Sequence, residues 1–289
     1  MDFLQPASWS EALAMKAEHP EAQPIAGGTD VMVEINLDHH RPDAIIDLTR
    51  VPELAEWGTD RGLLRIGAGV TYARIIEELG DRLPGLAMAS RTVGSPQIRN
   101  RGTVGGNLGS ASPAGDAHPP LLASGASVEL ASLAGTRRLL ARDFFVGPKR
   151  NAIRQDELIA AFLIEPAQGP QQFSKVGTRN AMVIAVCSFA LAINPKHRHI
   201  GTGIGSAAPT PVTADDAERF LEGVLDERDL WEKPAALEAS ALARFGDLVA
   251  AAARPIDDVR GTAAYRRHAL AVMARRCLVW AWNEYRGAA

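Results

Sequence analysis

Cysteine is nearly absent from this chain. Its 289 residues include only Cys187 and Cys277, and both lie in apolar stretches without the C-x-x-C spacing of a metal site. This pattern excludes a zinc finger, a disulfide scaffold and an iron–sulfur ligand set within the chain, and it fits a reducing compartment. Because the first residues also lack the basic and apolar stretch of a signal peptide, we expect a cytoplasmic protein.

An excess of positive charge is lacking as well. Lys and Arg total 31 against 34 Asp and Glu, which gives a net charge of -3. Nucleic acid and anionic membrane surfaces are therefore poor candidate partners, because both attract surplus positive charge. The longest apolar run, residues 182–193, is too short to span a bilayer. Since 46% of the residues are hydrophobic, we expect a folded protein without a membrane span.

The beginning of the chain has the pattern of a small α/β unit. Residues 8–11 form a capping box, which predicts a short amphipathic helix that ends near Pro20. A strand signal at residues 23–26, a glycine turn, a helix-like run at residues 31–35 and a strand signal at residues 44–48 follow.

From Leu63 onward, strand signals alternate with glycine-rich turns and short helices, which favours an α+β arrangement over a regular β-α-β one. Breakers at residues 165–170 predict a domain boundary. Strands are expected at residues 182–193 and 198–203, and helices after Thr213. One face of the last helix is expected to be buried, and it carries Tyr265, Ala269, Val272, Met273, Cys277 and Trp280.

Two glycine-rich stretches carry the strongest functional signal. The first is Ala26-Gly27-Gly28-Thr29-Asp30, between a strand signal and a helix signal, and the second spans residues 101–110. Glycines let the main chain approach a ligand closely and turn its amides outward, which suits phosphate. Either stretch alone is also consistent with a tight turn that needs positive φ. Together they favour a diphosphate ligand, with one nest for each phosphate.

Other nucleotide-binding fingerprints are absent or incomplete. The chain has no G-x-x-x-x-G-K-S/T motif, which excludes a P-loop nucleotidase. Gly67-Ala68-Gly69 resembles a Rossmann turn, but Tyr72 occupies the position of the third glycine. Gly203-Ile204-Gly205 also fits, yet Pro209 follows too soon for a binding helix. We therefore do not expect a Rossmann fold.

The glycine stretches, together with residues 97–108 and 111–116, resemble the FAD-binding medium subunit of molybdenum hydroxylases. This group includes xanthine dehydrogenase, carbon monoxide dehydrogenase, and several aldehyde and N-heterocycle dehydrogenases. The resemblance covers essentially the whole chain, including residues 257–266 near its end.

The resemblance implies an α+β protein with a two-part FAD-binding domain of the vanillyl-alcohol-oxidase-like (PCMH-type) kind. This domain would span residues 1–166, with subdomains at about 1–55 and 56–166. A C-terminal α+β domain with a small antiparallel sheet and helices would span residues 167–289.

The resemblance also implies the residues of a cofactor site. The diphosphate loops would be Ala26, Gly27, Gly28, Thr29 and Asp30, and Thr103, Val104, Gly105, Gly106 and Asn107. Ser110 and Asp116 would contact the ribityl and flavin side, and Ile159 would lie near the isoalloxazine. Lys175 would place a cation near the flavin, where it would stabilise the anionic reduced form. Some relatives stack an aromatic residue on the flavin, but residues 91–94 contain none.

The implied activity is electron transfer, with no catalytic residue or metal ligand in this chain. In the family, substrate is hydroxylated at molybdopterin in a large subunit, and electrons pass through two [2Fe–2S] clusters of a small subunit and then through FAD to an acceptor such as NAD. We expect a xanthine dehydrogenase-like complex, a dimer of heterotrimers. The alternatives are an aldehyde, CO or N-heterocycle dehydrogenase, a stand-alone FAD oxidase of the same fold, and a non-catalytic nucleotide-binding module.

Single polar residues leave some alternatives open. The pair His39 and His40 fits a polar loop better than a metal site, because adjacent side chains diverge. His118 is the histidine nearest to the expected site. Arg99 and Arg101 fit either neutralisation of a diphosphate, an ion pair with a partner subunit, or a solvated turn.

Overall fold

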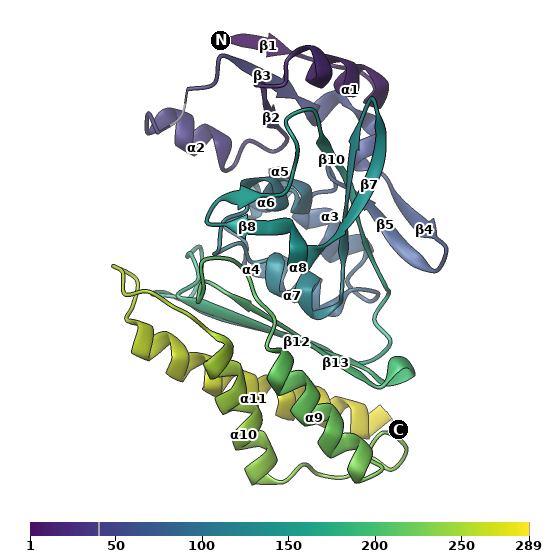
Figure 1. The fold of residues 1–289 in the computed structure, drawn as a ribbon, viewed down its shortest axis with the longest axis vertical. Coiled ribbons are helices and arrows are strands. Elements are labelled where there is room, and N and C mark those ends of the chain that lie inside the picture. The colour runs from purple at the N-terminus through teal and green to yellow at the C-terminus, as the bar shows by residue number, and fades with distance from the viewer. Residues whose placement is uncertain (40, 289) are drawn as a thin grey trace.

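The computed structural model describes residues 1–39 and 41–288, so His40 of the expected polar loop lies outside the described residues. Figure 1 shows three layers along the long axis, with the N-terminus in the first and the C-terminal helices in the last. Within the described residues, no helix is long and apolar enough to cross a membrane.

The first layer is a three-stranded parallel sheet with the strand order β1-β3-β2. Its elements are β1 (Asp2–Leu4), α1 (Trp9–Glu18), β2 (Gln23–Ile25), α2 (Val31–Asn36), β3 (Ala44–Asp47), and the 3-10 turns η1 (Leu48–Arg50) and η2 (Pro52–Ala55). The predicted helix start is confirmed, because the Ser8 hydroxyl accepts a hydrogen bond from the Glu11 amide and caps α1.

The middle layer is a five-stranded antiparallel sheet with the order β4-β5-β10-β6-β7. Its strands are β4 (Trp57–Asp60), β5 (Leu63–Gly67), β6 (Ser127–Ser132), β7 (Gly135–Leu140) and β10 (Leu158–Ile164). The helices around it are α3 (Tyr72–Glu78), α4 (Pro84–Thr92), α5 (Pro96–Arg101), α6 (Val104–Ser110), α7 (His118–Ala123) and α8 (Ala141–Phe144). A small hairpin pairs β8 (Phe145–Gly147) with β9 (Arg150–Asn151). The core between the sheet and the helices includes Ile66, Leu108 and Phe162, each 0 to 1% exposed.

The last layer is a three-stranded antiparallel sheet with the order β11-β12-β13. It consists of β11 (Gln171–Val176), β12 (Cys187–Asn194), the turn η3 (Pro195–His197) and β13 (His199–Gly205), followed by α9 (Asp215–Glu227), α10 (Ala239–Ala252) and α11 (Ala263–Ala288). The predicted strand at residues 182–193 is shorter than expected, because β12 begins at Cys187 and residues 182–186 form a loop. The α+β fold with a C-terminal antiparallel sheet is confirmed.

The last helix corrects one prediction from periodicity. Ala269, Met273 and Cys277 are buried against the sheet as expected, but Tyr265 and Trp280 are 48% and 50% exposed. The buried stripe is narrower than the apolar pattern, because α11 packs on β11, β12 and α10 with one face only.

Candidate cofactor site

One large cavity, of about 990 Å³, lies where all three layers meet. Its volume is at the upper end of the range of small-molecule sites. The lining comes from the first layer (Lys16, Gln23, Leu48), from both glycine stretches, and from residues 182–184 before β12. Every predicted site residue lines the cavity except Val104 and Lys175.

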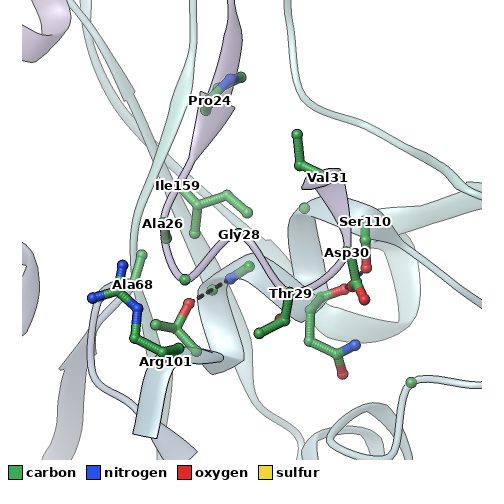
Figure 2. Close-up of a pocket in the computed structure, with 18 of the residues that line it drawn as sticks. Pro24, Ala26, Gly28, Thr29, Asp30, Val31, Ala68, Arg101, Ser110 and Ile159 are labelled. Atoms are coloured by element: carbon green, nitrogen blue, oxygen red, sulfur yellow. Dashed lines mark hydrogen bonds between the residues drawn. The ribbon is translucent and has the colours of Figure 1, made fainter. Parts of the chain in front are cut away.

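The first glycine loop, residues 26–30, leaves β2 and leads into α2, as Figure 2 shows. A Cβ atom on Gly27 would lie 2.0 Å from the Arg101 carbonyl oxygen, so only glycine lets this loop rest on the main chain before α6. Gly28 has φ +75°, a conformation that side chains other than hydrogen disfavour. The two glycine stretches, far apart in sequence, therefore meet main chain to main chain at the cavity.

The second stretch is helical rather than an open loop. Thr103 caps α6, with its hydroxyl oxygen accepting a hydrogen bond from the Gly106 amide at 2.8 Å (the dashed line in Figure 2). Gly105 rests on the main chain just after β5, since a Cβ there would lie 2.4 Å from the Ala68 carbonyl oxygen. Val104 points into the core with 0% exposure, which explains why it does not line the cavity.

Two residues of the cavity wall carry buried acceptor atoms without partners. Within the described part of the chain, Asn107 Oδ1 and Asp116 Oδ1 form no hydrogen bond, although both residues line the cavity. Buried polar atoms are normally satisfied, and an oxygen acceptor needs an N–H or O–H donor. Ser110 lies on α6, as Asn107 does, and its hydroxyl donates to the Asn107 carbonyl oxygen at 3.0 Å. This end of the cavity therefore suits a ligand with hydroxyl or ring N–H groups.

Asp116 is fixed by a buried ion pair with the C-terminal domain. Lys175 Nζ lies 2.5 Å from Asp116 Oδ2, and both side chains are less than a tenth exposed. The Thr92 hydroxyl also donates to Asp116 Oδ2, at 3.1 Å. Burial raises the pKa of Asp116, and the Lys175 ammonium opposes that effect. Lys175, the cation expected beside the flavin, is thus paired with Asp116. Because Lys175 does not line the cavity, it acts on the cavity only through Asp116.

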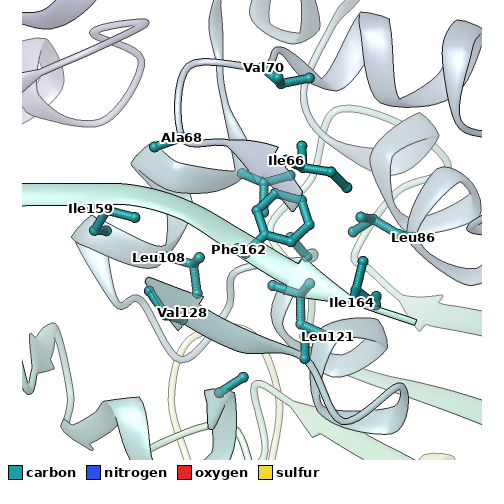
Figure 3. Close-up of a cluster of buried hydrophobic side chains, with 14 of the residues drawn as sticks. Ile66, Ala68, Val70, Leu86, Leu108, Leu121, Val128, Ile159, Phe162 and Ile164 are labelled. Carbon is teal, nitrogen blue, oxygen red and sulfur yellow. The ribbon is translucent and has the colours of Figure 1, made fainter. Parts of the chain in front are cut away.

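Ile159 lies on the cavity wall because of a β-bulge. The register of β10 against β6 shifts between Ile159 and Ala161, so Ala160 is an extra residue. Ile159 therefore shares a face with Phe162 and Ile164, as Figure 3 shows, and it forms part of the cavity lining. Residues 91–94, which contain no aromatic side chain, contribute Val93 and Gly94 to the wall.

Several lining residues carried no signal in the sequence. Tyr72, which spoils the Rossmann pattern, is a buried lining residue, and burial raises its pKa. Glu34 of α2 and Lys149 form an ion pair of 2.6 Å, and both residues line the cavity. Residues 182–184 were expected within a strand. Contacts between segments so distant in sequence leave no local pattern.

Arg99, Arg101 and His118, which lie near the expected site in the sequence, have different surroundings in the structure. Arg99 donates from Nη1 to the carbonyl oxygens of Arg91, Val93 and Gly94 at 3.1 to 3.3 Å, which fixes the turn after α4. Arg101 lines the cavity and forms no ion pair with any described residue. His118 is fully buried behind the wall, with Nε2 3.1 Å from the Asn107 carbonyl oxygen. No described group of His, Cys, Asp and Glu has the arrangement of a metal site.

Residues 1–166 match the family described as the FAD binding domain in molybdopterin dehydrogenase, and residues 172–281 match the CO dehydrogenase flavoprotein C-terminal domain. The nicotinate dehydrogenase FAD-subunit of Eubacterium barkeri is 34% identical, over 77% of this chain and 79% of that protein. The putative xanthine dehydrogenase FAD-binding subunit of Escherichia coli is 28% identical, over 96% and 94%.

A solved structure agrees with these matches. The carbon monoxide dehydrogenase from Hydrogenophaga pseudoflava that lacks the Mo-pyranopterin moiety of its molybdenum cofactor superposes with a TM-score of 0.89 at 27% identity, covering 99% of this chain and 98% of that one. With the family match over more than half of its length, the chain belongs to the FAD-binding medium subunits of the molybdopterin dehydrogenases, an oxidoreductase family.

Proposed function

We propose that this chain binds FAD in the cavity described above and transfers electrons within a heteromeric molybdenum hydroxylase. The observation that carries the proposal is the meeting of two glycine stretches at one cavity, whose far end holds buried acceptors without partners. The cavity fits a long ligand with a diphosphate in its middle and hydrogen-bond donors at one end. A bound flavin supplies one- and two-electron redox chemistry, and the protein supplies its position and its electrostatic surroundings.

The diphosphate would be held by the glycine stretches. Residues 26–30 and 103–107 bring main chain close to the ligand, because Gly27 and Gly105 leave no room for a Cβ on their far sides. Arg101, free of ion pairs with described residues, supplies a positive charge at the same place. We propose that Ala26, Thr29 and Asp30 form the rim of this nest, while Val104 supports it from the core.

The flavin would occupy the end next to the C-terminal domain. Asn107 Oδ1 and Asp116 Oδ1 accept hydrogen bonds from ribityl hydroxyls or the ring N–H, which phosphate cannot donate. Ser110 adds a hydroxyl, and Ile159 supplies an apolar wall. Lys175 acts on this end through Asp116, by keeping its carboxylate charged and in place.

The complex is proposed by analogy with the relatives. A small subunit with two [2Fe–2S] clusters and a large molybdopterin subunit would be the partners, NAD the acceptor, and a cytoplasmic dimer of heterotrimers the assembly. We favour a xanthine dehydrogenase-like complex, since relatives named for xanthine and nicotinate both point to an aromatic N-heterocycle as substrate. The domain division at residue 166 is supported by the sheets, which end at Ile164 and resume at Gln171.

The test is purification of the chain with and without its gene neighbours. We expect flavin absorption from the isolated chain, and iron and molybdenum when it is co-expressed with an adjacent [2Fe–2S] protein and molybdopterin protein. A colourless chain that fails to take up FAD would refute the proposal. Flavin with turnover of a small substrate by the chain alone would identify a stand-alone oxidase instead. Assays of the complex with xanthine, nicotinate, an aldehyde and CO decide the substrate.

A further inference from the structure

Residues 257–266 form a motif whose role the cavity lining does not explain. Asp257 caps α11, since its Oδ1 accepts a hydrogen bond from the Ala263 amide. Arg266 follows in the first turn of α11 and is only 4% exposed, although it is an arginine. A buried guanidinium requires partners, and these partners reveal what the motif does.

Arg266 binds two groups far apart in the sequence. Its Nη2 lies 2.5 Å from Asp258 Oδ1, which neutralises the charge, and its Nη1 donates to the Ser206 carbonyl oxygen at 2.5 Å. Ser206 follows β13 with φ +58°, a conformation that non-glycine residues rarely adopt. The Arg266 contact therefore holds a strained turn in place.

The turn at Ser206 also contacts the wall of the cavity and holds it in place. The Ser206 amide donates to the Pro113 carbonyl oxygen at 2.8 Å. Pro113 lies within the segment 112–116, of which all other members line the cavity. Asp258, Arg266, Ser206 and Pro113 thus form a continuous chain of hydrogen bonds from α11 to the cofactor site.

The glycines of β13 hold the next helix in the same way. A Cβ on Gly201 would lie 1.9 Å from the Ala123 carbonyl oxygen, and one on Gly203 would lie 2.0 Å from that of Pro119. Strand β13 therefore lies directly on α7, which follows the segment 112–116 along the chain. Gly203, the first glycine of the Gly203-Ile204-Gly205 sequence that resembled a Rossmann fingerprint, instead lets the C-terminal domain approach the wall.

We propose that Arg266 is a positioning residue for the cofactor site: through the Ser206 main chain it fixes Pro113, and with it the wall 112–116 at the flavin end of the cavity. This inference rests on the proposed function. Arg266 touches no ligand itself, so it affects the flavin end and leaves the diphosphate nest, built by residues 26–30 and 103–107, unchanged.

The test compares Arg266→Met and Arg266→Lys with the matched control Arg267→Met. Arg267 is the next residue of α11, exposed, and without an ion pair to any residue the structure describes. The apo form of each full-length variant is titrated with FAD, by the quenching of flavin fluorescence, and with ADP, which carries the adenosine and the diphosphate of FAD but no ribityl chain and no flavin. The visible spectrum of the bound flavin reports its surroundings.

We expect Arg266→Met to bind FAD about tenfold more weakly, the effect of removing a residue that orients a ligand-binding group, with ADP affinity unchanged. The flavin spectrum changes in this variant, and Arg267→Met matches the wild type. Arg266→Lys keeps the charge for Asp258 but cannot also reach Ser206, so its FAD affinity should lie between those of Arg266→Met and the wild type. This variant decides the question if the Met variant does not fold.

Two results overturn the inference alone. The first is wild-type FAD affinity in Arg266→Met, or in Arg266→Lys if the Met variant does not fold. The second is an equal loss of FAD and ADP affinity, which marks a general structural defect. Failure of the wild-type chain to bind FAD is a different result, because it overturns the proposed function and this inference together.

Discussion

The two walls of the cavity are held in different ways. The first wall, residues 26–30 and 103–107, is built by main chain resting on main chain, and glycines at the contacts make this possible. The second wall, residues 112–116, is fixed by side chains of the C-terminal domain, with Lys175 on Asp116 and Arg266 acting through Ser206. The first wall therefore depends on local sequence, and the second depends on how two domains pack.

The largest expected effect comes from removing the ion pair that fixes the second wall. Lys175→Met leaves the Asp116 carboxylate buried without its cation, and loss of one partner of a buried pair costs about 4 kcal/mol of unfolding free energy. Urea denaturation of the apo protein measures this loss. The matched control is Lys233→Met, because the Lys233 side chain is 82% exposed in its pair with Asp229 and should contribute less than about 0.5 kcal/mol.

A double variant separates charge from packing at this position. Lys175→Met combined with Asp116→Asn removes both charges, so at least about half of the lost stability should return. No recovery would show that the Lys175 stem, rather than its charge, holds the wall.

The first wall is best broken at Gly27. In Gly27→Ala the new Cβ meets the Arg101 carbonyl oxygen at 2.0 Å, so the two glycine stretches must separate, at a cost of about 3 kcal/mol. FAD titration should show loss of binding as well. Gly223→Ala in α9, where a Cβ has open space, is the control, and it should be stabilising by about 0.5 kcal/mol. Wild-type FAD affinity in Gly27→Ala would place the ligand elsewhere.

The difference between the walls also explains what could be predicted from the sequence. The glycine stretches were predictable because the close approach of main chain requires glycine, and that requirement is visible at Gly27 and Gly105 themselves. The α+β fold and its helix start at Ser8 were predictable from local patterns in the same way.

Contacts that depend on tertiary packing were not predictable. The pairing of Lys175 with Asp116 joins residues 59 positions apart, and the β-bulge that turns Ile159 into the cavity is set by its partner strand. Trp280 had the periodicity of a buried residue, yet half of its side chain is exposed. Periodicity predicts an apolar face, but only the packing determines how wide the buried part is.

Acidification should weaken the support behind the second wall through His118. Burial lowers the pKa of His118 from 6.5 to about 4, so the folded protein holds the ring neutral while the unfolded chain takes up a proton near pH 6.5. The stabilisation is complete above pH 6.5 and is lost as the pH falls toward 4, by about 2 kcal/mol between pH 7.5 and pH 5. Denaturation of wild type and His118→Asn across this range measures it.

The comparison of the two proteins isolates His118 from other titrating groups. The pKa of Asp116 is raised, which acts in the opposite direction on acidification, but Asp116 is present in both proteins and cancels in the difference. His118→Asn should therefore lose less stability than the wild type at low pH. Parallel profiles would show that the ring is not held neutral in the folded state.

The smallest expected effect concerns the second ion pair of the cavity, Glu34 with Lys149. It resembles the Lys175 pair, since it also joins distant segments at the cavity, but its side chains are 35% and 63% exposed. Solvent screens such a pair, so Glu34→Gln should change the unfolding free energy by less than about 0.5 kcal/mol, and less still in high salt. Denaturation at low and high salt tests this. If Glu34→Gln lost as much stability as Lys175→Met, an ion pair between distant segments would be enough to stabilise the wall. The expected difference between the two variants instead attributes the stability to the burial of the Lys175–Asp116 pair.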